Sequence, residues 1–421
     1  MLIDFDPRAG LKALTILGLA FASATAVAEP VSLREAQALA VARDAGGAAF
    51  AAEAEATRER AVAAGELPDP EARLGAVNVP ADSFEFGRED MTMIEVGVMQ
   101  RFPPGRSRSL ARQQLEHHAL HFDAEAAARA RDVRAAVARL WRELDYLEAT
   151  EALVAESRDR AKLTIESEAA AYASGEGRQA ELLAARLELF EVEEMLIERS
   201  RMRATARAEL ERWTGPLTDA RVPAPEPGEP APLPVLRERL ASHPMLRGLE
   251  HQAGAAELEA SLARERYKPS IGVDLGYGFR QGRDMLGESR PGMLTAMLTF
   301  DLPLFTRDRQ DRELAAARSM RRGAEARRED AARELDSVLA AVHTRALGLR
   351  AAQVLYRRDM LPVGNAAVEA ALASYRSGEG TLVDVVGAQR RLLELRDKEL
   401  RLGADFASAV AELESLTGEL P

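Results

Sequence analysis

The chain has 421 residues, a formal net charge of −12 at pH 7 and no cysteine. The acidic balance, without a basic stripe, argues against nucleic acid as a partner. The lack of cysteine excludes disulfides and thiolate metal sites. Alanine, leucine, glutamate and arginine dominate the composition, which favours long helices.

Residues 1–28 have the pattern of a secretory signal peptide. Arg8 and Lys12 supply positive charge around the start of an apolar run at residues 13–24, and Ala26-Val27-Ala28 fits a small-residue cleavage site. A membrane anchor is the alternative, although the run is short for a helix that spans a bilayer. The acidic residues before the run are unusual in a signal peptide, which leaves the true start of the protein open.

Residues 31–215 are predicted to place helices on both sides of a pair of strands. Pro103-Pro104-Gly105 marks the transition from strand to helix, and no proline or glycine follows between residues 106 and 171. The predicted elements are helices within 33–67, strands at 72–79 and 91–102, and a helical hairpin at 106–212.

Residues 216–232 contain six prolines and are predicted to form a stiff linker. The order of elements then repeats over residues 233–418, and Pro303 marks the second transition from strand to helix. The predicted elements are helices up to about 267, strands at 270–280 and 293–304, and a helical hairpin at 307–416.

Short motifs support this duplication. Tyr172-Ala-Ser-Gly-Glu-Gly177 recurs as Tyr375-Arg-Ser-Gly-Glu-Gly380, and Trp213-Thr-Gly215 recurs as Leu416-Thr-Gly418. A repeat this regular indicates that one structural unit was built twice.

The second pair of strands shows the clearest alternation. Apolar side chains occupy every second position: Ile271, Val273, Leu275, Tyr277 and Phe279 in one strand, then Leu294, Ala296, Leu298, Phe300 and Leu302 in the next. Each strand has about ten residues, the length that crosses a bilayer at a tilt. A half-buried hairpin of a soluble protein is the alternative. Four strands cannot close a barrel alone, and lipid does not tolerate an open edge, so a membrane interpretation requires several copies.

Several motifs together resemble the outer membrane factor family, the TolC-like ducts of Gram-negative efflux pumps and type I secretion systems. The resemblance covers residues 31–418, and the compact length without a lipidation cysteine looks most like the channels of heavy-metal exporting pumps. The motifs are the two Tyr-x-x-Gly turns, Phe102-Pro-Pro-Gly105, Leu302-Pro-Leu-Phe305 and Tyr375-x-x-Gly378-x5-Asp384-Val-Val-x-Ala388-Gln389.

The resemblance implies a mainly α fold with membrane β-strands. Three copies would combine twelve strands into one β-barrel, continuous with a long periplasmic α-helical barrel. The chain would then be the outer-membrane exit duct of a tripartite efflux pump, extending into the periplasm and conducting substrates passively. Its partners would be a periplasmic adaptor (membrane fusion) protein, an inner-membrane pump expected to be of the RND type, and outer-membrane lipid.

Other functions stay open from the sequence. A secreted or periplasmic coiled-coil scaffold or adaptor without a pore is one alternative, and the duct of a type I secretion system is another. No catalytic motif stands out, so we expect neither an enzyme nor a cofactor. The cargo is not identified: metal ions, drugs and secreted proteins all use this architecture.

The resemblance also assigns roles to the hairpin turns. Four glycines permit tight turns between helices and would form the periplasmic tip where the adaptor docks, with simple connection as the alternative: Gly175, Gly177, Gly378 and Gly380. Asp384 and Glu181 follow Tyr375 and Tyr172 by nine residues each. These carboxylates are expected to face the narrowed pore, and the tyrosines to help hold it closed. In a trimer, three symmetric carboxylates would attract cations. The alternative is that each carboxylate is an ordinary solvated charge on its helix.

Two departures from the family pattern concern this gate. Gly380 stands where a gating arginine is expected, and Gly387 stands where a second aspartate would add another ring. The sequence therefore leaves the hydrogen-bond network of the gate undetermined.

His117 and His121 lie on one helical face and suggest a metal site. An export duct must release its cargo, so a tight site in its wall would be counterproductive. We expect these histidines to form a solvated patch and to bind no metal.

Overall fold

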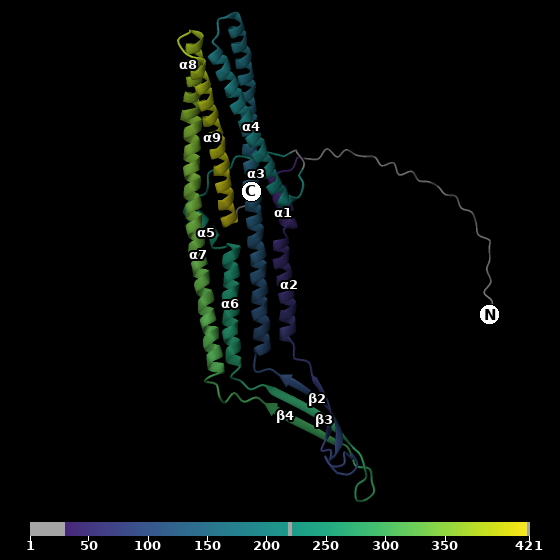
Figure 1. Ribbon diagram of the computed structural model, residues 1–421. Coiled ribbons are helices and arrows are strands. Elements are labelled where there is room, and N and C mark those ends of the chain that lie inside the picture. Colours follow the sequence, from purple (N-terminus) through teal and green to yellow (C-terminus); the bar gives the residue numbers. More distant parts are fainter. Residues whose placement is uncertain (1–29, 218–220, 419–421) are drawn as a thin grey trace, which may run out of the picture.

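The computed structural model describes residues 30–217 and 221–418, and the predicted signal peptide lies outside them. The molecule is elongated, with long helices along most of its length and a small sheet at one end (Figure 1). Among the described residues, no helix combines the length and the apolar character needed to cross a membrane.

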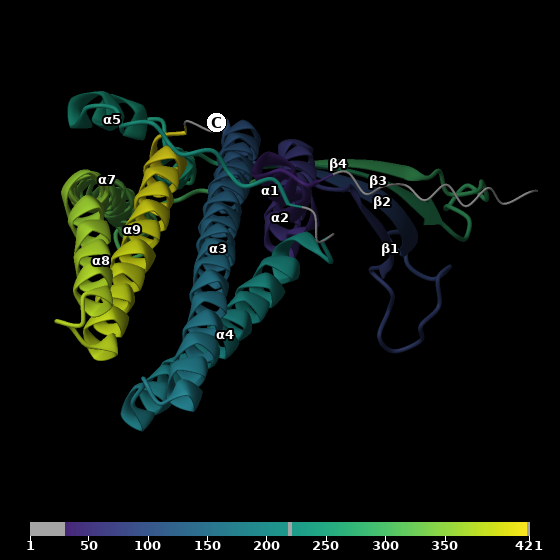
Figure 2. The same ribbon diagram turned by 90° about the horizontal axis from the view of Figure 1, so that it is seen from above.

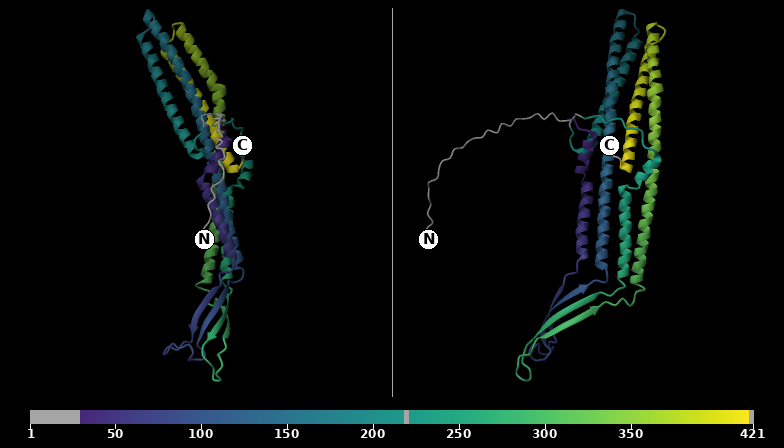
Figure 3. Two further views of the ribbon diagram at one scale, coloured as in Figure 1. Left: turned by 90° about the vertical axis from the view of Figure 1, so that its right-hand side faces the viewer. Right: turned by 180° about the vertical axis from the view of Figure 1, so that it is seen from behind.

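The first unit places its strands between two sets of helices. Its elements are α1 (Leu33–Arg43), α2 (Ala45–Gly65), β1 (Glu71–Val77), β2 (Met93–Phe102), α3 (Ser107–Ser174) and α4 (Gln179–Thr214). Helix α3 has 68 residues and spans roughly 100 Å at about 1.5 Å per residue. Both α2 and α4 pack along α3, so two shorter helices follow each other beside one long helix (Figure 3).

The second unit repeats this arrangement. Its elements are α5 (Leu233–Leu240), α6 (Pro244–Glu265), β3 (Ile271–Arg280), β4 (Met293–Phe300), α7 (Gln310–Leu355), α8 (Leu361–Arg376) and α9 (Leu382–Thr417). A π-helical turn, Tyr356–Met360, separates α7 from α8, where the sequence predicts one regular helix. Pro362 provides a physical reason, because its ring cannot fit against the carbonyl four residues earlier. The turn widens there, and the Leu361 amide donates to the Tyr356 carbonyl.

Two strands end earlier than the sequence predicts. Strand β1 ends at Val77 instead of residue 79, since Asn78 adopts a positive φ of 55° that leaves the extended conformation. Strand β4 ends at Phe300 instead of residue 304. Pro303 has no amide hydrogen for the ladder, which favours an early end there.

The four strands form one antiparallel sheet in the order β1-β2-β3-β4, so the central pair joins the two units. The register aligns apolar residues in rows, with Val96 opposite both Leu74 and Tyr277. The other face carries glycines and charged groups, including Arg73, whose guanidinium lies 2.7 Å from the Asp274 carboxylate. The sheet therefore has one apolar and one polar face.

Two equivalent hydrophobic cores lie near the middle of the molecule. The first surrounds Trp141, which is fully buried among residues of α1, α3 and α4. The second surrounds Phe406 and draws on α5, α7 and α9. The duplication is thus visible in packing as well as in the order of elements.

The proline-rich connection between the units lies across the helices as a strap, which we define as residues 221–232 (Figure 2). The Trp141 Nε1–H donates to the Val222 carbonyl at 3.3 Å, and Arg142 donates to the Ala224 carbonyl at 2.9 Å. These bonds hold the strap against α3.

Candidate functional site

The two helical hairpins end in matching turns at the end of the molecule opposite the sheet (Figure 1). Gly175 follows α3 with φ of 82°, and Gly378 lies in the other turn with φ of 78°, a region that favours glycine. Gly177 and Gly380 are restricted differently: a Cβ would lie 2.8 Å from the Tyr172 amide nitrogen in the first case and 2.8 Å from the Ser374 hydroxyl in the second. Each pair of glycines is therefore required by its turn.

Tyr375 connects the second hairpin to the first. Its hydroxyl donates to Glu168 Oε1 on α3 at 2.7 Å, and the Glu168 residue is only 5% exposed. The hydrogen bond to Glu168, aided by burial, raises the pKa of Tyr375 to about 12. Tyr172, at the matching position in the first repeat, is 47% exposed. The two tyrosines are therefore not equivalent.

Asp384 is exposed on the first turn of α9 and belongs to the cap of that helix. Its carboxylate accepts hydrogen bonds from the Thr381 amide at 2.9 Å and from the Thr381 hydroxyl at 2.7 Å. These bonds lower the pKa of Asp384, so the group carries its charge at neutral pH. Glu181 lies on the first turn of α4 and pairs with Arg178 at 3.1 Å.

Two ties near the tip involve residues that sequence reasoning missed. Glu168 is one, and Arg390 on α9 is the other, since it bonds both Glu188 and Glu191 on α4. A charged residue on a long helix has no pattern that reveals a partner on another hairpin. The only available signal for Glu168 was its place one helical turn before Tyr172.

A second set of polar ties joins the hairpins nearer the middle of the molecule. The Tyr146 hydroxyl on α3 donates to Asp397 Oδ1 on α9 at 2.9 Å, and Arg199 on α4 contacts both groups, at 3.1 and 3.2 Å. Burial, together with the nearby Asp397 charge, raises the pKa of Tyr146 to about 12. Three helices are held together at this level.

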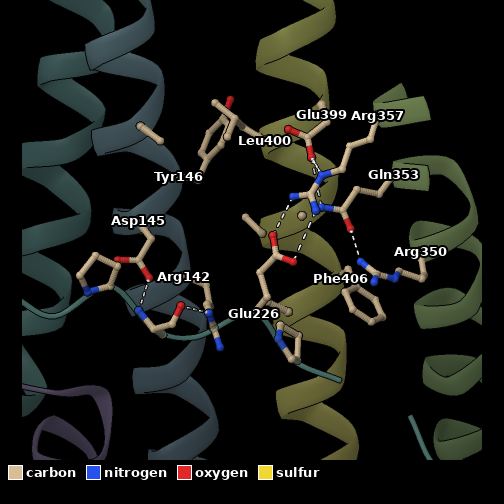
Figure 4. Close-up of a pocket in the computed structure, with 17 residues that line it drawn as sticks. Arg142, Asp145, Tyr146, Glu226, Arg350, Gln353, Arg357, Glu399, Leu400 and Phe406 are labelled. Carbon is tan, nitrogen blue, oxygen red and sulfur yellow. Dashed lines mark hydrogen bonds and ion pairs between the residues drawn. The ribbon is translucent and has the colours of Figure 1, made fainter. Parts of the chain in front are cut away.

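The strap also lines a cavity of about 170 Å³ between α3, α7 and α9 (Figure 4). Arg357, on the π-helical turn, pairs with Glu226 of the strap at 2.7 Å and with Glu399 of α9. Gln353 is 2% exposed and donates to Glu399 at 3.2 Å. The cavity thus contains the contacts by which the strap is fastened to the second unit.

The histidines are not the solvated patch that the sequence predicts. The His117 ring packs edge-on against His251 of α6, with centroids 5.6 Å apart. His121 lies 3.1 Å from the Gly248 carbonyl and 3.2 Å from Gln252. They belong to the seam where α6 packs on α3. Within residues 30–217 and 221–418, no three His, Asp or Glu side chains are placed to hold a metal ion.

Pro103 and Pro303 lie in the connections from β2 to α3 and from β4 to α7. Each connection carries the chain from the sheet into a long helix, as the sequence predicts for both prolines.

Comparison with known families decides the class of the protein. Residues 235–419 match the family described as outer membrane efflux protein. The second unit of the chain therefore carries the sequence pattern of this family. This match, with the structural neighbours below, confirms the predicted class and its location in the outer membrane. No curated protein sequence matches this chain significantly.

Solved structures share the fold of this chain at low sequence identity. CusC has a TM-score of 0.77 and 16% identity, with 91% of each chain covered. VceC from Vibrio cholerae has a TM-score of 0.74 and 19% identity, covering 91% of this chain and 96% of its own. MtrE from Neisseria gonorrhoeae, solved in an open state, has a TM-score of 0.73 and 18% identity, with 92% and 88% covered. CusC is described as forming a transmembrane channel, VceC as an outer membrane protein and MtrE as an outer membrane channel. Their structural similarity to this chain confirms the predicted mainly α fold.

Proposed function

We propose that this efflux protein works as a homotrimeric exit duct whose gate lies at the hairpin tips. The observation that carries the proposal is the sheet: four strands with one apolar face, continuous with helices roughly 100 Å long. A passive conduit needs both parts, one to cross the outer membrane and one to extend into the periplasm.

The sheet supports assembly because both of its edges are open. Strand β1 pairs only with β2, and β4 only with β3, among the described strands. An apolar face suits lipid, but an unpaired edge in lipid leaves backbone groups without partners. Pairing β4 of one copy with β1 of the next satisfies both edges, and three copies of four strands give a barrel of twelve.

The helices carry exposed apolar stripes that also favour assembly. On α4, Leu183, Leu187, Phe190 and Ile197 lie on one face and are 54–72% exposed. Lone exposed apolar residues are ordinary, but a stripe at helical spacing suits a helix of another copy. We assign this stripe to the wall between neighbouring chains.

The polar ties near the tips suit a gate. Opening the tunnel requires the second hairpin to move relative to the first, which would break the bonds of Tyr375 and Arg390. Asp384 would contribute one carboxylate per chain to the narrowed pore, where three negative charges attract cations. The tip turns would dock the periplasmic adaptor, and the inner-membrane pump, expected to be of the RND type, would supply the energy. Heavy-metal cations are one candidate cargo.

The test uses adjacent residues on opposite faces of β4. Leu298→Arg places a charge on the apolar face, and Thr299→Arg is its matched control on the polar face. An arginine facing lipid costs about 2–4 kcal/mol at the bilayer midplane. We expect the purified wild type and Thr299→Arg to be detergent-dependent trimers that conduct ions in planar bilayers, while Leu298→Arg fails to assemble.

A secreted scaffold without a pore would behave differently. It would be soluble without detergent, conduct no ions and show the same effect for both substitutions. That result would refute the proposed duct.

A further inference from the structure

A cavity lies where the second unit passes from sheet to helices. It occupies about 600 Å³ between the connection from α6 to β3 and the connection from β4 to α7. Its polar lining comes from Arg266, Lys268, Ser270, Asp301, Arg309, Gln310 and Glu313. The chain bends at this junction between the sheet and the long helices (Figure 3). In the proposed duct it is where the membrane meets the periplasm.

The lining carries three basic side chains and two acidic ones, and two of the basic groups are already paired. Lys268 pairs with Glu265 at 2.7 Å, and Glu265 also accepts the Arg106 amide at 2.8 Å. Arg266 is neutralised by Glu313 at 2.6 Å. Arg309 has no ion-pair partner within residues 30–217 and 221–418, so its charge is available to a ligand.

Gln310 supplies an independent sign of a ligand. It lines the same cavity and is 8% exposed, yet its Oε1 is buried and accepts no hydrogen bond from any described residue. Burying a carbonyl-type acceptor without a donor costs about 1–3 kcal/mol. A ligand that brings a donor would remove this cost.

An apolar segment adjoins the cavity. Leu302, Leu304 and Phe305 are 65%, 74% and 87% exposed. They continue from the apolar face of the sheet, where Phe300 lies opposite Ile271. Aromatic and aliphatic side chains next to basic groups are typical of the boundary between lipid tails and headgroups.

We propose that this cavity binds the headgroup of a phosphatidylethanolamine-type phospholipid from the periplasmic leaflet; the inference rests on the proposed membrane duct. The phosphate lies against Arg309 and Lys268, and the ammonium group donates to Gln310 Oε1. The acyl chains follow Leu304 and Phe305 onto the sheet. Asp301 and Glu313 in the lining disfavour a bare anion and suit a headgroup that carries both charges.

The experiment titrates the purified trimer in detergent with defined lipids and counts bound molecules by native mass spectrometry. The probes are phosphatidylethanolamine, phosphatidylcholine, whose methylated amine cannot donate a hydrogen bond, and inorganic phosphate. We expect the ethanolamine lipid to bind tightest and phosphate not to compete. Equal binding of both lipids, or displacement by phosphate, would overturn the proposal.

Substitutions locate the site. Arg309→Gln should weaken binding of the ethanolamine lipid about fivefold, the value of one surface charge near phosphate. Gln310→Leu should remove the preference over phosphatidylcholine. The matched control is Arg327→Gln, an exposed arginine 18 residues along α7, about 27 Å away. Should Arg309→Gln bind lipid like the control, the site is wrong.

Conductance in planar bilayers, measured on the same preparations, separates this inference from the duct itself. A conducting trimer without lipid preference rejects the lipid site alone. A protein that neither assembles nor conducts rejects both.

Discussion

Tyr375→Phe tests whether the tie to Glu168 holds the tunnel closed. The substitution removes only the hydroxyl that donates to Glu168 at 2.7 Å. A hydrogen bond to a charged group is worth about 1.5–3 kcal/mol, and Glu168, at 5% exposure, has little water to replace it. If the bond exists only in the closed state, each chain shifts the equilibrium toward opening by roughly ten- to hundredfold.

The assay is the single-channel open probability in planar bilayers. We expect Tyr375→Phe to raise it strongly and Glu168→Gln to raise it less, because the amide oxygen still accepts the hydroxyl. Tyr172→Phe is the matched control, since Tyr172 is 47% exposed at the equivalent turn. The reasoning is refuted if Tyr375→Phe gates like the wild type or like Tyr172→Phe.

The same hydrogen bond predicts the pH range over which the closed state is stabilised. The pKa of Tyr375 is raised to about 12, so the phenol keeps its proton beyond the ordinary value of 10. The stabilisation is present in full below pH 10 and is lost as the pH rises through about 12. A tyrosine latch should therefore be insensitive to pH across the range in which cells live.

Three further predictions concern other parts of the chain. Gly378→Val forces a β-branched residue to φ of 78°, at a cost of about 1–3 kcal/mol, and should reduce export and cross-linking to the adaptor without reducing trimer yield; full export would contradict the tip assignment. Asp384→Asn should move the reversal potential in a salt gradient toward zero, because its carboxylate is charged at neutral pH; an unchanged potential would place Asp384 outside the pore. Burial lowers the pKa of His243 to about 4, so as the pH falls the unfolded chain binds a proton before the folded chain does. The free energy of unfolding should therefore fall by roughly 3 kcal/mol between pH 6.5 and 4. Thermal melts of His243→Asn should lose most of that pH dependence.

The order of helices and strands was predictable because it depends on local pattern. Alternation identified β3 and β4, although it placed the end of β4 four residues too late, and the repeated Tyr-x-x-Gly motif located both hairpin turns. Each of these signals lies within about ten residues of the feature that it predicts.

The bonds between hairpins could not be predicted in this way. Tyr375 and Glu168 are 207 residues apart, and Arg390 is 199 residues from Glu191. Two long helices can rotate relative to each other, and their rotation decides which of the many exposed charged side chains form pairs. The prediction of a solvated histidine patch was wrong for the same reason. The packing of α6 on α3 covers a helix face that the sequence alone predicts to be exposed.

Fusing two copies of the unit allows the hairpins to specialise. At the tip, both donors, Tyr375 and Arg390, belong to the second copy, and all their acceptors belong to the first: Glu168, Glu188 and Glu191. In a ring of six identical hairpins, every hairpin would have to carry donor and acceptor alike. In the proposed trimer the fused chain would instead alternate two kinds of tip around the ring. A partner that met all six tips would encounter two different surfaces, and mutations in one copy could alter closure without altering what the other copy presents.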